Sequence, residues 1–124
     1  VLQKTFPSLA VIGPFELTNP WFYHLDTAFA LLNKNTVLYY PDAFSQKTQQ
    51  IIPELFSNAM PVSKADTSNF ALNMVCINKT IFLNTCSQEL QQILESLGYT
   101  VIKLGLTEFL KSGGSIKCLT LRIA

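Results

Sequence analysis

Charged residues are scarce in this chain: 14% of its 124 residues are Asp, Glu, Lys or Arg, and the net charge is +1. A nucleic-acid-binding surface needs a cluster of basic side chains, so this balance argues against a nucleic-acid partner. Long apolar runs are also missing. None approaches the roughly 18 residues of a membrane helix, which argues against a membrane partner. Hydrophobic residues nevertheless make up 48% of the chain, which predicts apolar surface that another chain or further segments would cover.

Metal-binding and secretory signals are missing too. The three cysteines, Cys76, Cys86 and Cys118, form no C-x-x-C pair and have no histidines beside them, whereas a zinc site needs about four nitrogen or sulfur ligands. A disulfide between Cys76 and Cys86 remains open. The chain starts at Val1 without a signal peptide, which favours reduced thiols and a cytoplasmic location. Because it opens with a predicted strand, Leu9–Ile12, we expect a fragment, a processed chain or one subunit.

One pattern occurs twice: strand, polar turn, strand, helix, strand. The Asn33-Lys34 turn recurs as Asn78-Lys79, 45 residues on, and Gln49-Gln50 of the first helix recurs as Gln91-Gln92, 42 residues on. A period of this length indicates a repeated supersecondary unit whose copies bury each other's apolar faces. The sequence therefore predicts an α/β fold of ββαβ modules at about 21–66 and 67–106, followed by a loop and strand at 107–124.

The predicted helices have recognisable ends. Ser45 and Ser87 are placed as N-caps, and Gly98 lies where a helix C-cap belongs, in line with the preferences of these residue types. Strands and helices alternate in every α/β protein, which is the alternative to a true repeat. The shared Asn-Lys turn and Gln-Gln helix entry weigh against coincidence.

Functional candidates begin with the one histidine, His24, and with Asp26 two residues later. We expect both on a strand, where residues two apart point to the same face. An imidazole and a carboxylate would then project together, while Tyr23, Leu25 and Thr27 project the other way. A purely structural role for a lone histidine remains the alternative.

Cys118 is the third candidate. It follows the polar loop Ser112–Lys117, in which Gly113 and Gly114 allow the backbone to approach a ligand closely. It opens a predicted strand in which Cys118, Thr120 and Arg122 alternate with core-facing Leu119, Leu121 and Ile123. Lys117 and exposed backbone N–H groups would favour the thiolate. Cys76 and Cys86 lie in or beside apolar strands, where a buried, inert thiol is expected.

A cysteine and a histidine, each beside a loop, are the minimum parts for nucleophilic thiol chemistry. His24 precedes Cys118 by 94 residues, an order that opposes a papain-like protease, and the caspase signature is absent. Asp26 suits a cation, and a guanidinium is a planar fork of donors that fits a carboxylate bidentately. An enzyme acting on that group needs carboxylates to orient it, a soft nucleophile and an acid for the departing amine.

Four segments together resemble the guanidine-modifying enzyme superfamily: His24-Leu25-Asp26-Thr27, Leu38-Tyr39-Tyr40-Pro41, Phe70-Ala71-Leu72-Asn73 and Phe109–Leu121. Its members include arginine deiminase, dimethylarginine dimethylaminohydrolase, arginine dihydrolase and the amidinotransferases, and the likeness is closest to bacterial dimethylargininase-like and arginine dihydrolase-like proteins. The resemblance implies the pentein fold, a five-module pseudo-symmetric α/β-propeller, of which residues 1–124 would form about the C-terminal half.

The resemblance also implies roles for these residues. Cys118 would be the nucleophile, His24 the general acid and base, and Asp26 a carboxylate that grips the guanidinium. Backbone groups of Gly113, Gly114 and Ser115 would line the substrate pocket. The implied reaction is hydrolysis of arginine or a methylated arginine through a covalent thiouronium adduct, without a metal or an organic cofactor.

One part of the family pattern has no counterpart here. Members carry a further acidic partner for the histidine, and substrate-binding Asp and Arg residues, in an N-terminal half, whereas the single arginine here is Arg122, after the nucleophile. We therefore expect little activity unless the chain pairs with itself or with such a half. An amidinotransferase, a non-catalytic binding module of the same propeller fold and an unrelated α/β interaction domain remain the alternatives.

Overall fold

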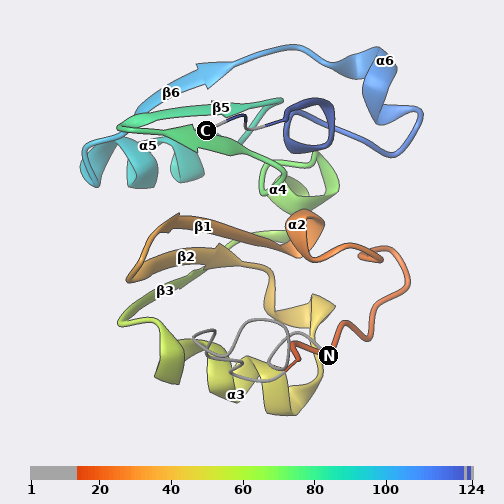
Figure 1. Cartoon of the computed structure of the whole chain (residues 1–124), viewed down its shortest axis with the longest axis vertical. Helices are drawn as coiled ribbons and strands as arrows, with labels where there is room; N and C mark the ends of the chain where they lie inside the picture. Colours follow the sequence, from red (N-terminus) through yellow and green to blue (C-terminus); the bar gives the residue numbers. More distant parts are fainter. Residues whose placement is uncertain (1–13, 122, 124) are drawn as a thin grey trace.

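The computed structural model describes residues 14–121 and 123. The predicted strand Leu9–Ile12 and the predicted strand residue Arg122 lie outside this range. Within it, helices and strands alternate as two units of the same kind, one above the other in Figure 1. Every helix in this range falls short of the length and hydrophobicity needed to cross a membrane.

The first unit consists of β1 (Phe29–Asn33), β2 (Thr36–Tyr39), α3 (Gln46–Leu55) and β3 (Asn58–Pro61). β1 and β2 are antiparallel, while β2 and β3 are parallel, so β2 is the central strand and is buried along its whole length. Asn33 stabilises the turn between β1 and β2, because its Oδ1 accepts hydrogen bonds from the N–H groups of Asn35 and Thr36, both at 3.0 Å. This local bonding explains why the sequence has Asn at the turn.

The second unit repeats this plan with β4 (Val75–Ile77), β5 (Thr80–Leu83), α5 (Gln88–Ser96) and β6 (Thr100–Lys103). β5 is again central, antiparallel to β4 and parallel to β6. Its turn contains Asn78 with a φ of 56°, in the left-handed region that Asn tolerates better than most residues. The predicted repetition of ββαβ modules is confirmed.

Both long helices begin as predicted, and α5 also ends as predicted. The Oγ atoms of Ser45 and Ser87 accept the N–H groups of Thr48 and Leu90, at 3.4 and 3.1 Å. Gly98 follows α5 with a φ of 81°, and its N–H donates to the carbonyl of Glu95 at 2.9 Å while the N–H of Tyr99 donates to Leu94 at 3.1 Å. These two bonds form a Schellman motif, which needs a residue such as glycine in the left-handed region.

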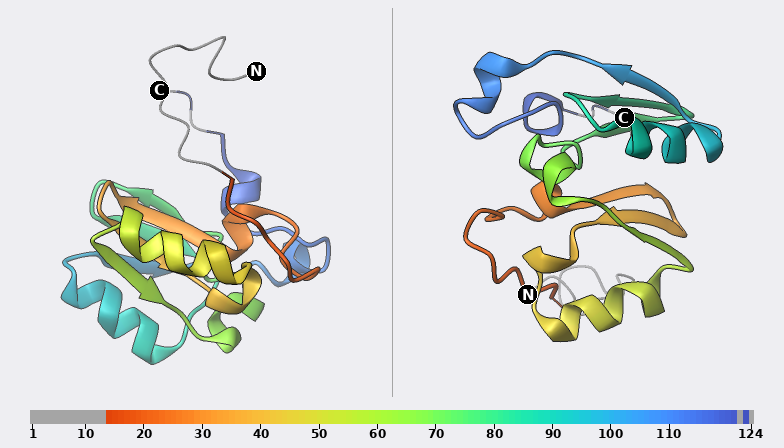
Figure 2. Two further views of the ribbon diagram at one scale, coloured as in Figure 1. Left: turned by 90° about the horizontal axis from the view of Figure 1, so that it is seen from below. Right: turned by 180° about the vertical axis from the view of Figure 1, so that it is seen from behind.

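Five short elements lie before, within, between and after these units. They are α2 (Leu25–Ala28) before the first unit, η1 (Pro41–Ala43) within it, α4 (Lys64–Ser68) between the two, and α6 (Thr107–Leu110) and η2 (Lys117–Leu119) after the second. In Figure 1 and both views of Figure 2, η2 and α2 lie at the same end of the two sheets, although they lie at opposite ends of the described chain. The fold thereby brings His24 and Asp26, at the start of α2, to the same end of the molecule as Cys118 in η2.

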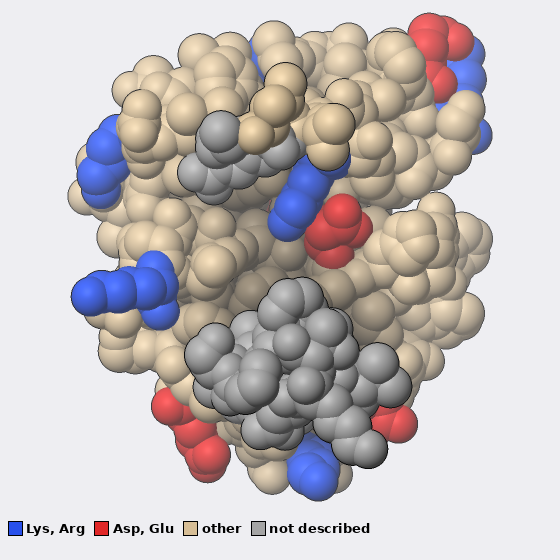
Figure 3. All heavy atoms as spheres, viewed as in Figure 1, with Lys and Arg blue, Asp and Glu red and all other residues tan. Residues whose placement is uncertain are grey.

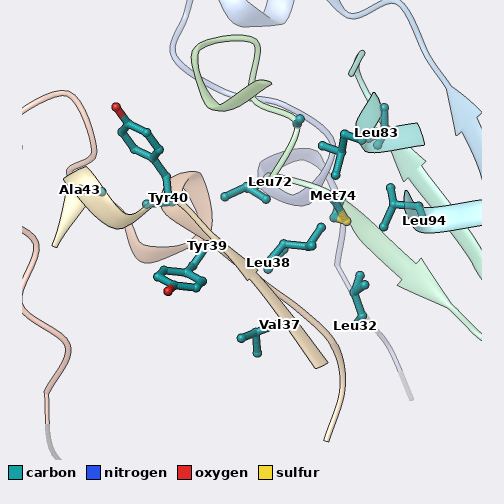
Figure 4. Close-up of a cluster of buried hydrophobic side chains, with 14 of the residues drawn as sticks. Leu32, Val37, Leu38, Tyr39, Tyr40, Ala43, Leu72, Met74, Leu83 and Leu94 are labelled. Atoms are coloured by element: carbon teal, nitrogen blue, oxygen red, sulfur yellow. The ribbon is translucent and has the colours of Figure 1, made fainter. Parts of the chain in front are cut away.

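The core is shared between the two units. Figure 4 shows Leu72 and Met74 lying between Leu38 of β2 and the side chains Leu83 of β5 and Leu94 of α5. All five side chains are at least 95% buried. The segment that joins the two units is therefore packed from both sides, which fixes the position of the residue between Leu72 and Met74.

Two of the predicted strands are wrong. His24 and Asp26 do not lie on a strand: His24 is the N-cap of α2 and Asp26 is in its first turn. The reason is local, because the N–H and Oγ1 of Thr27 both donate to the carbonyl of His24, at 3.1 and 2.6 Å. Side chains that compete for the backbone in this way favour turns over strands.

Cys118 likewise does not open a strand, because it lies in the 3₁₀ turn η2. The N–H groups of Lys117 and Cys118 donate to the side chain of Asn73, so they are not free to join a ladder. The supposed core-facing side of that strand is also in solvent: Leu119, Leu121 and Ile123 are 50%, 87% and 91% exposed.

The face shown in Figure 3 carries scattered charged side chains, with an acidic one beside a basic one near its centre.

Candidate active site

Asn73 is the residue around which the candidate site is arranged. Its side chain is fully buried. Its Nδ2 donates to the Sγ of Cys118 at 3.4 Å and to the backbone carbonyl of Asp26 at 3.5 Å. Its Oδ1 accepts from the backbone N–H groups of Lys117 and Cys118, at 3.1 and 3.4 Å. One amide therefore joins α2 to η2.

Cys118 differs from the other two cysteines in its surroundings. All three are free thiols, but Cys118 is exposed whereas Cys76 and Cys86 are half-buried. Burial raises the pKa of the Cys76 thiol, with the charge of Lys79 acting in the opposite direction. Burial also raises the pKa of the Cys86 thiol, again opposed by a lysine, Lys103. Cys118 is thus the cysteine that a substrate can reach.

His24 is exposed, and its side chain makes no capping hydrogen bond to α2. Its ring packs edge-on against the ring of Tyr23, with 4.8 Å between the centroids and an interplanar angle of 64°. Thr27 holds the backbone of His24 through the two hydrogen bonds described above. The backbone of this residue is therefore fixed while its imidazole is left open to solvent.

Asp26 carries an unsatisfied carboxylate oxygen. The residue is half-buried, and its Oδ1 atom is buried without a hydrogen-bond partner among residues 14–121 and 123. A buried acceptor without a donor costs free energy. A donor arriving from outside the described residues would therefore bind favourably here.

The loop before Cys118 is fastened to the neighbour of His24. The Tyr23 hydroxyl donates to the carbonyl of Gly113 at 3.3 Å. Gly113 has a φ of 75°, and a Cβ at this position would lie 2.8 Å from the Tyr23 hydroxyl. Both the backbone conformation and the available space therefore require glycine. A Cβ on Gly114 would lie 3.5 Å from the Cβ of Cys118, so the loop passes directly beside the nucleophile candidate.

Ser115 is the candidate whose side chain points away from solvent. It is fully buried, and its Oγ finds no hydrogen-bond partner in the described part of the chain. Because the whole residue is buried, its backbone is no more open to solvent than its side chain.

A cavity of about 870 Å³ has Gly113 and Tyr23 among its lining residues. Its walls do not include Cys118, His24 or Asp26. It is lined by residues of the 19–27 loop, η1, α4 and the 110–113 loop: Asn19, Trp21, Phe22, Tyr23, Thr27, Tyr40, Asp42, Lys64, Thr67, Ser68, Phe70, Leu110, Lys111 and Gly113. The cavity and the cluster around Asn73 are therefore separate features that share the contact between Tyr23 and Gly113.

Comparison with known proteins decides the family. No protein-family model matches the chain. The dimethylarginine dimethylaminohydrolase of Mycobacterium tuberculosis is 42% identical over 118 residues, which cover 92% of this chain and 39% of that protein. The bifunctional arginine dihydrolase/ornithine cyclodeaminase AgrE of a Nostoc species is 42% identical over 113 residues, or 87% of this chain and 16% of that protein. The chain belongs to the guanidine-modifying enzyme superfamily, the penteins.

Solved pentein structures have the same fold. The N-terminal domain of ArgZ, a cyanobacterial arginine dihydrolase bound to its product, matches with a TM-score of 0.91 at 38% identity and covers 99% of this chain and 45% of that one. The amidinotransferase SxtG of Microseira wollei matches with a TM-score of 0.75 at 17% identity, over 99% of this chain and 37% of that one, a likeness of fold alone. The predicted partial pentein fold is confirmed, and the chain spans less than half the length of these relatives.

The candidate site contains two residues that the sequence alone does not assign to it. Asn73 was noted only as the end of the Phe70–Asn73 motif, and Tyr23 was expected to face away from His24. An asparagine directly after the apolar run Phe70-Ala71-Leu72 is a signal for a buried, bonded amide, but its partners lie 45 and 47 residues away. The structure brings Cys118 and the Asp26 backbone together through this amide, and brings Gly113 next to Tyr23.

Proposed function

We propose that this chain supplies the thiol, the acid–base group and a carboxylate of a site that hydrolyses arginine or a methylated arginine at a guanidinium C–N bond. The observation that carries the proposal is the Asn73 amide, which holds the Sγ of exposed Cys118 and the backbone of Asp26 in one cluster. The pentein relatives named for arginine dihydrolysis and dimethylarginine hydrolysis support this substrate class.

In the first step, the thiolate of Cys118 attacks the central guanidinium carbon and forms a C–S bond. As the C–N bond breaks, protonated His24 gives its proton to the departing ammonia or amine, leaving a thiouronium adduct on the sulfur. One solved ArgZ structure is described as covalently bound to a reaction intermediate, which supports a covalent route for this chain.

In the second step, neutral His24 takes a proton from a water molecule, and the resulting hydroxide attacks the same carbon. The C–S bond breaks, the electron pair returns to the Cys118 sulfur as a thiolate, the proton of the newly added hydroxyl group passes to solvent, and a neutral urea-type product leaves. His24 is again protonated, so the site is restored. The exposure of both His24 and Cys118 leaves these side chains accessible to water and substrate.

Asp26 provides the reason for a cationic substrate. Its buried, unpartnered Oδ1 marks a carboxylate that lacks donors among the described residues, and a guanidinium presents paired N–H donors that fit a carboxylate. Binding there would lie close to Cys118, because the Asp26 backbone and the Cys118 sulfur share one amide group. Backbone groups of the half-buried Gly113 and Gly114 complete the proposed pocket, with the fully buried Ser115 behind them in the chain.

The test is product formation from arginine and from dimethylarginine, measured as release of ammonia or dimethylamine with identification of citrulline or ornithine. It is run on this chain and on the full reading frame that contains it, each with Cys118→Ser as the control. We expect turnover from the full reading frame that is abolished by Cys118→Ser, with citrulline or ornithine identifying the reaction.

Absence of turnover of both arginine and dimethylarginine, in both proteins, would contradict hydrolysis. If an amidine group is instead transferred to an added amine, the protein is an amidinotransferase. If arginine binds without any turnover, the chain is a binding module of the pentein fold. A Cys118→Ser protein that retains turnover would remove Cys118 from the mechanism.

A further inference from the structure

Asn73 uses its whole hydrogen-bonding capacity inside the protein. The amide has two N–H donors and an oxygen with two acceptor sites. The donors go to the Cys118 sulfur and the Asp26 carbonyl, and the acceptors take the N–H groups of Lys117 and Cys118. A fifth bond anchors the backbone, since the Asn73 carbonyl accepts the N–H of Lys117 at 3.3 Å.

This network fixes which end of the amide faces the sulfur. If the amide were flipped, its NH₂ group would face the N–H groups of Lys117 and Cys118, and donors would oppose donors. Only the orientation with Nδ2 toward the Cys118 sulfur satisfies all four partners. The thiol is therefore faced by an N–H donor, which stabilises a sulfur that carries negative charge more than one that does not.

The backbone before Asn73 is also held in an unusual conformation. Phe70 has a φ of 58°, which is rare for a bulky side chain and costs free energy. The N–H of Asn73 donates to the carbonyl of this residue at 3.1 Å, and Leu72 and Met74 are locked in the core on either side (Figure 4). The amide is thus presented to the sulfur from a rigid support.

We infer that Asn73 is a positioning residue for the nucleophile: it orients the Cys118 sulfur and stabilises its thiolate through the Nδ2–H···S hydrogen bond. The inference rests on the proposed function, in which Cys118 attacks the substrate. Asn73 does not touch the reacting carbon and acts only through the sulfur and the turn that carries it.

A second buried asparagine offers a matched control. Asn84 is 5% exposed, and it too bridges distant segments, because its Nδ2 donates to the Asn69 carbonyl at 3.2 Å and its Oδ1 accepts the Leu106 N–H at 2.9 Å. It has no contact with Cys118 among the bonds of the described residues. Replacing either asparagine by aspartate buries a carboxylate, but only Asn73→Asp removes a donor from the sulfur.

The experiment is iodoacetamide labelling of the whole chain at neutral pH, with the rate at each cysteine followed by peptide mass spectrometry. A hydrogen bond to a charged group is strong enough to change the ratio of thiolate to thiol by about ten- to a hundredfold. A thiolate that is less stabilised is also a better nucleophile, and this offsets about half of the change in rate on a logarithmic scale. We expect Asn73→Asp to slow labelling of Cys118 by about three- to tenfold. Asn84→Asp should leave that rate unchanged, and Cys76 and Cys86 serve as internal references.

The outcomes separate this inference from the proposed function. Slow labelling of Cys118 in the unaltered chain, no faster than Cys76 and Cys86, overturns the proposed function. Fast labelling that is the same in Asn73→Asp overturns the role of Asn73 alone. In the full reading frame, Asn73→Asp should lower kcat with little change in KM, whereas a loss confined to KM would contradict a role at the sulfur.

A spectroscopic measurement covers the case in which Asn73→Asp does not fold. In an NMR spectrum, the side-chain amide proton of Asn73 that faces the sulfur should resonate downfield. This chemical shift should persist in Cys118→Ser, where the hydroxyl oxygen remains as an acceptor, and should be lost in Cys118→Ala. The amide of Asn84 should not move in either variant. An Asn73 resonance that is the same in all three proteins would exclude the hydrogen bond.

Discussion

The Nδ2 of Asn73 lies 3.4 Å from the Sγ of Cys118, although 45 residues separate them in the sequence. The contact crosses from the segment between the two ββαβ units to the turn η2 that follows the second unit. It makes the position of the exposed thiol depend on a fully buried side chain. Stability of the core and reactivity of the surface cysteine are therefore coupled in this chain.

Alanine substitutions at three glycines should separate the free-energy cost of a left-handed backbone from the cost of a steric clash. Gly105 has neither a left-handed φ nor a close neighbour, Gly98 has a φ of 81° and open space, and Gly113 has a φ of 75° and the Tyr23 hydroxyl 2.8 Å from the site of a Cβ. A left-handed backbone costs a non-glycine residue roughly 1–2 kcal/mol. Urea unfolding measures the free energy of unfolding of each variant. We expect Gly105→Ala to leave it nearly unchanged, Gly98→Ala to lower it by the cost of the left-handed backbone, and Gly113→Ala to lower it further.

Tyr23→Phe supplies the control for this series, because it removes the hydroxyl that a Cβ at position 113 would meet. In the Tyr23→Phe background, the cost of Gly113→Ala should fall to that of Gly98→Ala. Equal costs for Gly98→Ala and Gly113→Ala in the unaltered background would show that the loop moves away from Tyr23 freely.

The two serine caps should differ in importance although they occupy equivalent places. Loss of an N-cap costs about 1 kcal/mol, which is what we expect for Ser45→Ala. Ser87→Ala should cost more, because the Ser87 Oγ also donates to the buried Asp66 carboxylate at 3.0 Å. Urea midpoints of the two variants give the comparison, and a smaller loss for Ser87→Ala would contradict the argument.

Asp66, in α4 between the two units, should be a charged residue whose substitution strongly lowers stability. It is 4% exposed, and its carboxylate accepts the Ser63 hydroxyl at 2.8 Å and the Ser87 N–H at 2.6 Å, in addition to the Ser87 hydroxyl. We expect Asp66→Asn to lower the free energy of unfolding by about 2–3 kcal/mol, since one acceptor becomes a donor facing donors. Glu89→Gln, at an exposed site in the first turn of α5, is the control and should be nearly neutral.

Tyr40 should contribute to instability at alkaline pH. Burial raises its pKa above the ordinary value of 10.0, and the hydrogen bond to Asp42 and the Asp42 charge raise it further. The phenol therefore loses its proton more readily in the unfolded chain, so its stabilising effect is complete below pH 10.0 and is lost as the pH rises through its higher folded value. Cys76 and Cys86, whose pKa values burial also raises, are replaced by alanine so that their titration does not contribute. In this background, Tyr40→Phe should make the fall of the free energy of unfolding at alkaline pH shallower.

Asp42→Asn tests the cause of this effect, because it removes the charge next to the Tyr40 hydroxyl. Its alkaline fall should lie between those of the unaltered protein and Tyr40→Phe. If all three proteins lose stability along the same curve, Tyr40 does not contribute to it.

The fold was predictable from the sequence because its determinants are local. Apolar alternation, the Asn-Lys turns and the serine caps lie within the elements they define, and the structure has two ββαβ units. The strands expected around His24 and after Cys118 were wrong for the opposite reason. The alternation after Cys118 imitates a half-buried strand, yet its apolar side is exposed, and the turn there depends on Asn73, far away in the sequence.

The candidate site was predictable only in part. The types and order of His24, Asp26 and Cys118 indicated the chemistry through the family resemblance, and the family is confirmed. Their roles stay predictions. The Asn73 bridge and the contact between Tyr23 and Gly113 could not be foreseen, because each joins segments that only packing of the two units brings together.

The contact between Tyr23 and Gly113 has a consequence for related sequences as they diverge. A tyrosine at position 23 leaves no room for a side chain at position 113, and the hydroxyl needs the carbonyl there as its acceptor. A lineage that replaces the glycine must first shorten the aromatic residue or rebuild the loop. The two positions should therefore change together over evolutionary time, and this pair would report the shape of the loop before position 118 even where the cysteine itself has been lost.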